Sequence, residues 1–368
     1  MRVELRGVHV HRDKKPVLRN LGLTTKENEY LVILGGNGVG KTTTLRTIAG
    51  LQSLHAGDVL IGGESVAHRP PRKRSVSMVF QDNALFPHLT VGQNIRQSQK
   101  REGTKKEQDA EFNEIINRLR LDSLIHRYPD QISGGEARRT AIAKAMAKRA
   151  GIRLLDEPLS ALDPVLRPQF LHDLHVWHST SGGTTIHVTH DGEEAMQIAD
   201  RIAILSDGQI VQVDTPTKIY DQPMNLDAAT ALGCPAMNLI RFREPSDQVG
   251  VHVDVPSNWL SMKSVRSDSV FLGVRPEDMR IAGSAGSDPL IPKQCLSLEV
   301  EISRCWRSYT RLRLSTIWNN RLIEISLDPN DQHSSNLIGD LVPGDRLQAY
   351  VSLDRIHIFE ADSGLRID

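Results

Sequence analysis

Residues 35–43 read GGNGVGKTT, and this stretch decides the fold. It follows a short apolar run and precedes residues 42–49, whose apolar side chains have helical spacing. Its glycines, Lys41 and Thr42 have the spacing of a phosphate-binding loop between a strand and a helix. Glycines let backbone N–H groups point inward around phosphate oxygens, and the helix adds its positive dipole end. The stretch therefore predicts a nucleotide site in which Lys41 reaches the β- and γ-phosphates and Thr42 ligates Mg²⁺.

A second motif, IRLLDEP at residues 152–158, places two carboxylates where an apolar strand ends. Because α/β sheets bind ligands at the carboxyl ends of strands, Asp156 and Glu157 are expected beside the nucleotide. One carboxylate can hold the Mg²⁺ shell, and the next can polarise an attacking water. A third motif, ISGGEARR at residues 132–139, opens a predicted helix with Ser133 and two glycines, a suitable anion site. On its own, this third motif could equally be an ordinary capped helix start.

These three motifs, in this order, resemble those of the ATP-binding cassette ATPases. Three further stretches carry the resemblance: Gln81 after SVSMVF, SALD at residues 160–163, and VTHD at residues 188–191. The resemblance covers about residues 3–235. It implies that two copies of the chain enclose and hydrolyse ATP, so ATP and Mg²⁺ are the expected cofactors.

The resemblance also assigns roles to individual residues. Glu157 is the expected catalytic base, His190 is expected to contact the γ-phosphate, and Lys41 and Gln81 complete the catalytic set. The expected Mg²⁺ ligands are Thr42, Gln81 and Asp156. The residues expected at the nucleotide are Gly35, Asn37, Gly38, Gly40, Lys41, Thr42, Thr43 and Arg12 of one copy, and Ser133, Gly135 and the bridging Asp163 of the other.

Four positions depart from the pattern of this family. Glu136 ends the ISGGE signature where glutamine is usual, which puts an acid near the phosphates bound by the second copy. Arg153 lies in an otherwise apolar strand, at a folding cost unless its guanidinium reaches solvent. The aromatic residue that usually stacks on adenine is absent, which leaves His11 or Arg12 to stack. Asn28 replaces a usual glycine, and asparagine tolerates the left-handed conformation.

The pattern of apolar and polar residues changes after about residue 233. The alternating strand and helix patterns before it predict a largely parallel α/β fold, here a P-loop NTPase cassette with a helical subdomain at about residues 82–150. Residues 107–121 carry the apolar stripe of an amphipathic helix. Later runs such as LSLEVEI and RLQAYV predict an antiparallel all-β domain of OB type, similar to TOBE domains. We therefore expect a cassette domain at residues 1–235 and a C-terminal OB-like regulatory domain at residues 236–368.

The composition excludes several classes of protein. The 368 residues carry 45 basic and 45 acidic side chains, and 4% of the residues are aromatic. A neutral chain with few aromatic residues is not expected to bind nucleic acid, which selects basic surfaces and stacking platforms. The N-terminus lacks the apolar run of a signal peptide, and no stretch has the length of a membrane span. Three cysteines are too few for a disulfide framework, so reduced thiols in a cytosolic protein are expected.

A single cassette without a fused membrane span or a long heptad insertion resembles the separate ATPase subunit of an importer. Such a subunit is expected as a homodimer, peripheral on the cytoplasmic face of the inner membrane, docked on two transmembrane permease subunits. A solute-binding protein is an indirect partner. The stretch QDNALFPHLTV, residues 81–91, resembles the loop that receives the coupling helix of the membrane subunit, through Leu85, Phe86 and Leu89. Internal packing of Leu85 and Leu89 is the alternative.

Three C-terminal stretches narrow the class of importer. GCPAMNLI (233–240), GVRPEDMRI (273–281) and IFEADSGLRI (358–367) resemble the regulatory extension of carbohydrate-importer ATPases, which include the maltose and glycerol-phosphate systems. The expected function is therefore ATP hydrolysis that powers import of a sugar or a related small solute. Two alternatives stay open: an importer ATPase for polyamine, iron or sulfate, and a regulatory nucleotide-binding protein with weak turnover.

Overall fold

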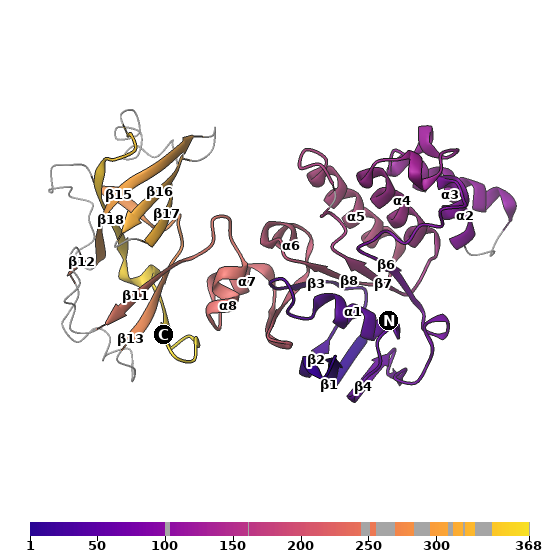
Figure 1. The fold of residues 1–368 in the computed structure, drawn as a ribbon, viewed down its shortest axis with the longest axis horizontal. Coiled ribbons are helices and arrows are strands. Elements are labelled where there is room, and N and C mark those ends of the chain that lie inside the picture. Colours follow the sequence, from indigo (N-terminus) through magenta and orange to yellow (C-terminus); the bar gives the residue numbers. More distant parts are fainter. Residues whose placement is uncertain are drawn as a thin grey trace. The chain divides into compact units, whose positions relative to one another are not determined.

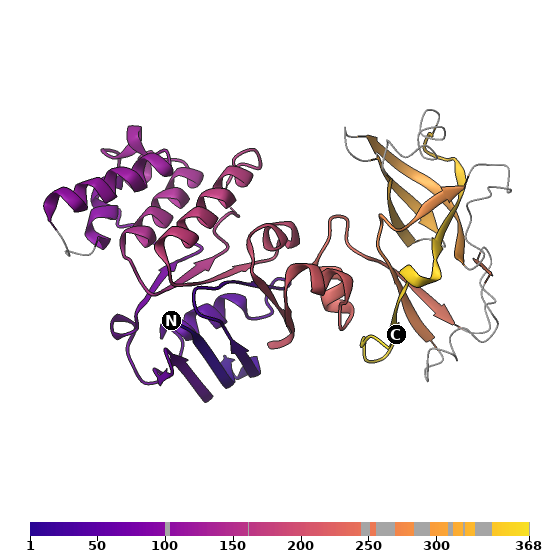
Figure 2. The ribbon, with the colours of Figure 1, turned by 180° about the vertical axis from the view of Figure 1, so that it is seen from behind.

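The computed structural model divides into two compact units, Met1–Gln222 and Pro223–Asp368, each of which we describe by itself (Figure 1 and Figure 2). None of the described helices is long and apolar enough to cross a bilayer. The described residues are 1–99, 104–160, 162–243, 251–254, 269–282, 295–307, 312–318, 321–327 and 341–367.

The first unit begins with a four-stranded antiparallel sheet in the order β2-β1-β4-β5. In β1, the buried residues Val8 and Val10 alternate with partly exposed histidines, as expected for a strand with one covered face. The covered face belongs to one apolar cluster with Ile33 of the central sheet and Leu45 of helix α1. The bounds are β1 (Val3–Arg12), β2 (Lys15–Thr24), β4 (Ala56–Ile61), β5 (Glu64–Ser65) and α1 (Lys41–Ala49).

A six-stranded sheet in the order β10-β9-β3-β8-β7-β6 forms the centre of this unit. Its neighbouring strands from β9 to β6 are parallel, and β10 pairs antiparallel with β9. Strands β3, β7 and β8 are buried along their whole length, as is typical of parallel strands with both faces covered. Because the carboxyl ends of parallel strands meet at one edge, the motifs that follow these three strands lie together. The bounds are β3 (Tyr30–Leu34), β6 (Val76–Val79), β7 (Ile152–Asp156), β8 (Thr184–Thr189), β9 (Arg201–Ser206) and β10 (Gln209–Asp214).

Helices α2, α3 and α4 lie between β6 and β7 in the chain, in the region expected as a helical subdomain. Figure 1 shows them, with α5, gathered on the side of the central sheet opposite to β1, β2 and β4. Helix α3 buries Phe112, Ile115 and Ile116, which belong to the stripe seen in the sequence. The bounds are α2 (Val91–Ser98), α3 (Lys105–Arg118), α4 (Gly134–Ala147), α5 (Arg167–Ser181), α6 (Gly192–Ile198) and α7 (Pro216–Asp221), with short 3₁₀ turns η1 (Pro71–Lys73), η2 (Asp122–Leu124) and η3 (Pro129–Gln131).

The second unit is built mainly from antiparallel strands. One sheet has the order β11-β13-β19, and the other has the order β14-β18-β15-β16-β17, with β12 also paired to β15. Val274, Leu296 and Leu314 belong to the apolar cluster that the two sheets share. The described residues thus have the antiparallel β architecture expected from the sequence. The bounds are β11 (Asn238–Arg243), β12 (Val251–Asp254), β13 (Ser269–Val274), β14 (Arg280–Ala282), β15 (Cys295–Arg307), β16 (Leu312–Trp318), β17 (Arg321–Leu327), β18 (Arg346–Ser352), η4 (Leu353–Arg355) and β19 (His357–Glu360).

Residues 223–235 belong to the second unit, whereas the pattern of the sequence predicted them to be part of the first. They include the short helix α8 (Leu226–Ala231). The buried Arg275 guanidinium donates hydrogen bonds to the carbonyl oxygens of Ala229 at 3.2 Å and Leu232 at 2.7 Å. These contacts tie the segment to the C-terminal strands, so the boundary lies after Gln222 and not after residue 235.

Candidate functional site

The loop predicted to bind phosphate, residues 35–43, leads from β3 into the start of α1. Glycine is required at Gly40, whose φ of 112° lies in the left-handed region. A β-carbon there would also lie 2.7 Å from Leu18 Cδ2 of β2. A β-carbon at Gly35 would collide with the carbonyl oxygen of Leu205 of β9. The loop is therefore closely packed between two strands, and its shape depends on these glycines.

Lys41 begins α1, and its side chain folds back over the loop. Its Nζ donates to the carbonyl oxygens of Gly35 at 2.9 Å and Gly36 at 2.8 Å. Burial lowers the pKa of Lys41, and the negative charges of Glu157 and Asp156 act in the opposite direction. Within the described part of the chain the ammonium group has no ion-pair partner. An anionic oxygen placed in the loop would therefore find a buried cation ready to bind it.

Thr42 and Asp156 are in contact at the carboxyl edge of the sheet. Thr42 Oγ1 donates a hydrogen bond of 3.0 Å to Asp156 Oδ1. Burial raises the pKa of Asp156, and the hydrogen bond from Thr42 acts against it. Mg²⁺ prefers oxygen ligands and is bound by one or two protein groups together with phosphates and water. The hydroxyl and carboxylate oxygens of this pair suit that ion.

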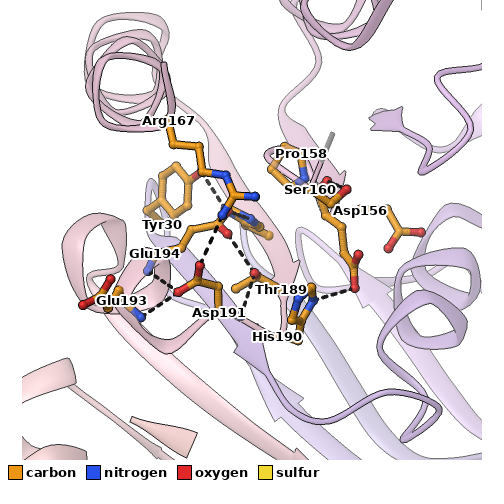
Figure 3. Close-up of polar contacts among 12 residues, drawn as sticks. Tyr30, Asp156, Pro158, Ser160, Arg167, Thr189, His190, Asp191, Glu193 and Glu194 are labelled. Carbon is orange, nitrogen blue, oxygen red and sulfur yellow. Dashed lines mark hydrogen bonds and ion pairs between the residues drawn. The ribbon is translucent and has the colours of Figure 1, made fainter. Parts of the chain in front are cut away.

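Glu157 and His190 meet from the ends of β7 and β8, and Figure 3 shows His190 at the end of its strand. His190 Nδ1 lies 3.2 Å from Glu157 Oε1. Glu157 has a φ of 46°, unusual for a residue with a β-carbon, and its N–H donates to the carbonyl oxygen of Val188. The His190 side chain is 53% exposed and that of Glu157 is 16% exposed. A carboxylate held in this way can act as a base on a bound water molecule.

Arg138 organises this edge of the sheet, and the motifs did not predict it. Its buried guanidinium donates to the carbonyl oxygens of Phe80, Asp156, Glu157 and Pro158. Burial lowers the pKa of Arg138, and the neighbouring carboxylates act in the opposite direction. The side chain thus joins the ends of β6 and β7 and fixes the unusual backbone at Glu157. The only signal in the sequence is an arginine among small and apolar residues on a buried helix face.

Ser133 caps α4 through reciprocal hydrogen bonds with Glu136. The N–H and Oγ–H of Ser133 donate to Glu136 Oε2 at 2.7 and 2.9 Å, and the N–H of Glu136 donates to Ser133 Oγ at 3.3 Å. These bonds, the backbone one first, lower the pKa of Glu136 and keep it ionised. In the described residues, no hydrogen bond or ion pair joins Ser133 or Gly135 to residues 35–43 of the same chain.

Three predicted residues outside the phosphate-binding loop are exposed. Gln81 follows β6, and Asp163 lies in the turn before α5, where its Oδ1 accepts the N–H of residue 165 at 2.8 Å. Arg12 ends β1. The ring of His11 packs edge-on against His55 with a centroid distance of 4.6 Å. Of the two candidates for stacking on adenine, Arg12 is thus the one whose side chain is not already packed against a ring.

Two departures from the family pattern have structural explanations. Arg153 does not reach solvent, since it is 3% exposed. Its guanidinium lies 4.6 Å from the centre of the Trp177 ring and donates to the carbonyl oxygen of Gly182. Burial lowers the pKa of Arg153 to about 10. Asn28 adopts a φ of 54°, and its Oδ1 accepts the N–H of Gly183 at 2.8 Å, as asparagine permits.

Comparison with known proteins places the chain in a family. A family model described as "ABC transporter" matches residues 18–160, which contain the loop and both carboxylates. The xylose/arabinose import ATP-binding protein XacJ of Haloferax volcanii is 38% identical over 95% of this chain and 91% of its own length. The chain belongs to the ABC transporter family of ATP-binding proteins. The spermidine/putrescine import ATP-binding protein PotA of Thermotoga maritima is 40% identical over 76% of this chain and 77% of its own length.

A solved structure matches the first unit of this ABC ATPase. It is the dimeric, post-hydrolysis state of the ATP-binding cassette MJ0796 bound to ADP and Pi, with 28% identity and a TM-score of 0.53. The match covers 58% of this chain and 98% of that cassette. The predicted P-loop cassette fold and the predicted ATPase class are thereby confirmed.

Proposed function

We propose that this ABC ATPase hydrolyses ATP with Mg²⁺ between two copies of itself and thereby powers import of a sugar or a related small solute. Two separate transmembrane permease subunits form the pathway, a solute-binding protein delivers the solute to them, and the ATPase lies peripherally on the cytoplasmic face of the inner membrane. The supporting observation is the convergence of two residue pairs beside Lys41: Thr42 with Asp156, and Glu157 with His190.

ATP would lie with its phosphates in the loop between β3 and α1. Lys41, which the loop carbonyls hold in the free chain, would turn to the β- and γ-phosphates because an anionic oxygen is the stronger acceptor. The N–H groups at the start of α1 add the positive end of the helix dipole. Bound Mg²⁺ neutralises phosphate charge, and Thr42, Asp156 and Gln81 are the residues proposed to hold it.

Glu157 would orient the attacking water and take its proton. Arg138 and Val188 hold the Glu157 backbone from both sides, so the carboxylate projects from the end of β7. His190 Nδ1 lies 3.2 Å from that carboxylate, and its exposed ring is proposed to contact the γ-phosphate. Water attacks the γ-phosphorus, the bond to the β-phosphate oxygen breaks, and ADP and phosphate are the products.

A second copy is proposed because part of the site is not assembled within one chain. Ser133 and Gly135 have no described contact with residues 35–43. The cassette MJ0796 is dimeric and bound to ADP and Pi, which supports the presence of a second copy. The start of α4, a suitable anion site, is proposed to face the loop of that copy. Ser133 would then exchange its bond to Glu136 for a phosphate oxygen. Because Glu136 stays ionised beside it, ATP binds more weakly than it would opposite a glutamine.

The assignment to a sugar rests on how far the similarity extends. The matches to the xylose/arabinose and the polyamine relatives both continue into the second unit, but the first spans 95% of this chain and the second 76%. The second unit also contains the stretches at residues 233–240 and 358–367 that resemble carbohydrate importers. A polyamine, iron or sulfate importer is the alternative within transport.

A groove of about 430 Å³ beside residues 81–91 is the proposed dock for a helix of the permease subunits. Phe86, 40% exposed, lines it, and Lys144 Nζ lies 4.1 Å from the centre of the Phe86 ring. Burial lowers the pKa of Lys144. An apolar helix with an acidic side chain would suit this groove. Of the three predicted contact residues, Phe86 is in the described lining, while Leu85 and Leu89 are not.

Steady-state release of phosphate from Mg-ATP tests the proposed chemistry. Glu157→Gln should lower kcat by a factor of about 100 or more while ATP still binds, because the base is lost and the phosphate contacts are kept. Glu193→Gln is the matched control, since Glu193 is an exposed acid on α6. Unchanged turnover in Glu157→Gln contradicts the assignment of the base. A wild-type kcat far below the usual range of about 1–1000 s⁻¹ favours the regulatory alternative with weak turnover.

Uptake by proteoliposomes that contain the ATPase and its permease subunits tests the solute class. We expect ATP-dependent accumulation of a labelled pentose, hexose or glycerol phosphate, and none of spermidine, ferric ion or sulfate. Uptake of one of the latter three instead would replace the sugar assignment and leave the ATPase assignment intact.

A further inference from the structure

A buried pair, His187 and Glu194, lies beside the strand end that carries His190. His187 is on β8 and is 0% exposed, and Glu194 is in the first turn of α6 and is 8% exposed. His187 Nε2 and Glu194 Oε1 are 2.8 Å apart. Neither atom has another hydrogen-bond partner in the part of the chain that the structure describes. A buried imidazole and a buried carboxylate in this position depend on each other.

A third buried side chain, Tyr30, contacts the other face of this pair. Its Oη lies within hydrogen-bond distance of His187 Nδ1, at 3.1 Å. Burial raises the pKa of Tyr30 well above its ordinary value, so the phenol keeps its proton. His187 Nε2, the other ring nitrogen, faces Glu194. Burial acts to raise the pKa of Glu194, but His187 and Thr189 outweigh it, so this pKa lies below its ordinary value and the carboxylate is ionised.

The second oxygen of Glu194 acts on the residue before His190. Thr189 Oγ1 donates a hydrogen bond of 2.9 Å to Glu194 Oε2. The same hydroxyl accepts the backbone N–H of Asp191 at 3.1 Å. The hydroxyl proton points at the Glu194 carboxylate. The orientation of the hydroxyl is therefore fixed, and one of its oxygen lone pairs points at the N–H of Asp191. One buried hydroxyl therefore joins the two residues that flank His190.

The residue after His190 is fixed a second time by its own side chain (Figure 3). Asp191 Oδ1 accepts the N–H groups of Glu193 at 2.9 Å and Glu194 at 3.1 Å, which caps α6. Its Oδ2 lies 3.8 Å from Arg167 Nη1, on the helix that follows the SALD stretch. The backbone of residues 189–191 is thus held between β8, α5 and α6.

We propose that Glu194 is a positioning residue for hydrolysis, which acts through the Thr189 hydroxyl to fix the backbone that presents His190 to Glu157. The proposal rests on the proposed function, in which His190 contacts the γ-phosphate. The His190 side chain is half exposed, and Glu157 is its partner among the described residues. The position of the His190 ring is therefore set by its own backbone. The buried Glu194 fixes that backbone through the Thr189 hydroxyl.

Two substitutions of Thr189 separate the hydroxyl from the bulk of the side chain. Thr189→Val keeps the shape and removes the bridge, so we expect kcat for Mg-ATP to fall about tenfold while KM stays within about twofold. Thr189→Ser keeps the bridge and should recover kcat to within about threefold of wild type. Glu194→Gln keeps the size of Glu194 but reverses a hydrogen-bond direction, and should lower kcat as Thr189→Val does. Glu193→Gln is the control one residue away, outside the buried cluster.

A spectroscopic measurement makes the proposal independent of activity. In nucleotide-free protein with labelled histidine rings, the His190 signal is identified by its absence in His190→Ala. Thr189→Val and Glu194→Gln should shift this signal, whereas Thr189→Ser and Glu193→Gln should not. Melting temperatures of all variants show which losses come from unfolding.

The outcomes separate the two proposals. If the wild type does not hydrolyse ATP, the proposed function fails, and the His190 signal still decides whether Glu194 positions that ring. If the wild type is active but Thr189→Val and Thr189→Ser have equal kcat and equal His190 signals, Glu194 has no positioning role. The same conclusion follows if each loss of kcat matches the fraction of protein that is unfolded.

Discussion

Arg153 is a cation in the interior of the central sheet whose neighbours are neutral groups. The Trp177 ring, the Gly182 carbonyl and the Thr185 hydroxyl surround it, and no acidic partner is present among the described residues. A buried charge without a counter-charge is usually replaced by an apolar side chain at little cost or with a gain. We therefore predict that Arg153→Met raises the melting temperature by about 2–4 °C without changing kcat, measured by calorimetry and phosphate release.

The pH dependence of this gain follows from the lowered pKa. As pH rises through about 10, folded Arg153 gives up its proton while the unfolded chain keeps it. The unfolded state then binds more protons, so the stability of the wild type rises relative to the variant. The advantage of Arg153→Met should accordingly shrink above about pH 10. Exposed Arg19→Met is the control, and an advantage that is constant across this range would show that charge is not its cause.

The residues of the proposed nucleotide site follow from the sequence to the extent that the chemistry fixes their type and spacing. Phosphate and Mg²⁺ require glycines, a lysine, a hydroxyl and a carboxylate at set positions, so the motifs alone indicate Lys41, Thr42 and Asp156. Arg138 could not be predicted, because it binds backbone carbonyls, which every residue has. The role of Glu194 could not be predicted for a related reason: its partners on β8 come close to it only when the chain folds.

The loop between β6 and α2 is organised around one buried side chain, Asn94. Its Nδ2 donates to the carbonyl oxygens of Phe86, Leu89 and Thr90, and its Oδ1 accepts the N–H of Phe86. Truncation leaves these backbone groups without partners in a buried site. We predict that Asn94→Ala lowers the free energy of unfolding by about 2–4 kcal/mol in urea titrations. Exposed Asn113→Ala should change it little, and an equal loss in both variants would contradict this role of Asn94.

The same loop presents Phe86 to the groove proposed as the permease dock. Phe86→Asp places a charge where an apolar helix face is expected, and it also removes the ring under Lys144. We predict that uptake by the assembled transporter falls about tenfold or more, while the ATPase activity of the isolated chain is unchanged. Phe86→Leu keeps an apolar surface and should retain most uptake. Normal uptake and normal solute-stimulated turnover with Phe86→Asp would contradict docking at this groove.

At the level of elements, periodicity predicted types and faces better than ends. The stripe at residues 107–121 indicates helix α3, which the structure places at Lys105–Arg118. The helix starts earlier because Thr104 forms a capping box with Glu107: the N–H of Thr104 donates to the carboxylate at 2.7 Å. A cap depends on local hydrogen bonds and not on an apolar pattern, so the stripe could not show it.

The boundary between the two units shows a different limit of prediction from the sequence. Near residue 233 the sequence pattern changes from mixed strands and helices to strands alone. The division after Gln222 instead reflects which residues pack together in the folded chain. Helix α8 continues the helical pattern of the first unit, yet Ala229 packs with Met237 and Phe359 of the second. The architecture of each unit could be predicted from the chain, but the assignment of a connecting helix required its contacts.

The whole molecule is proposed to act as a pair, and this can be tested apart from catalysis. In Glu157→Gln, ATP binds without being hydrolysed, so the two copies should accumulate in the closed state and sediment as a dimer at concentrations where the nucleotide-free chain is a monomer. ADP should not produce this shift, because it lacks the γ-phosphate that Ser133 of the second copy is proposed to bind. Adding Ser133→Arg puts a bulky side chain at the start of α4 and should abolish the ATP-dependent dimer, while binding of a fluorescent ATP analogue to the single chain is retained. If Glu157→Gln/Ser133→Arg still dimerises with ATP, the start of α4 does not face the nucleotide of the second copy.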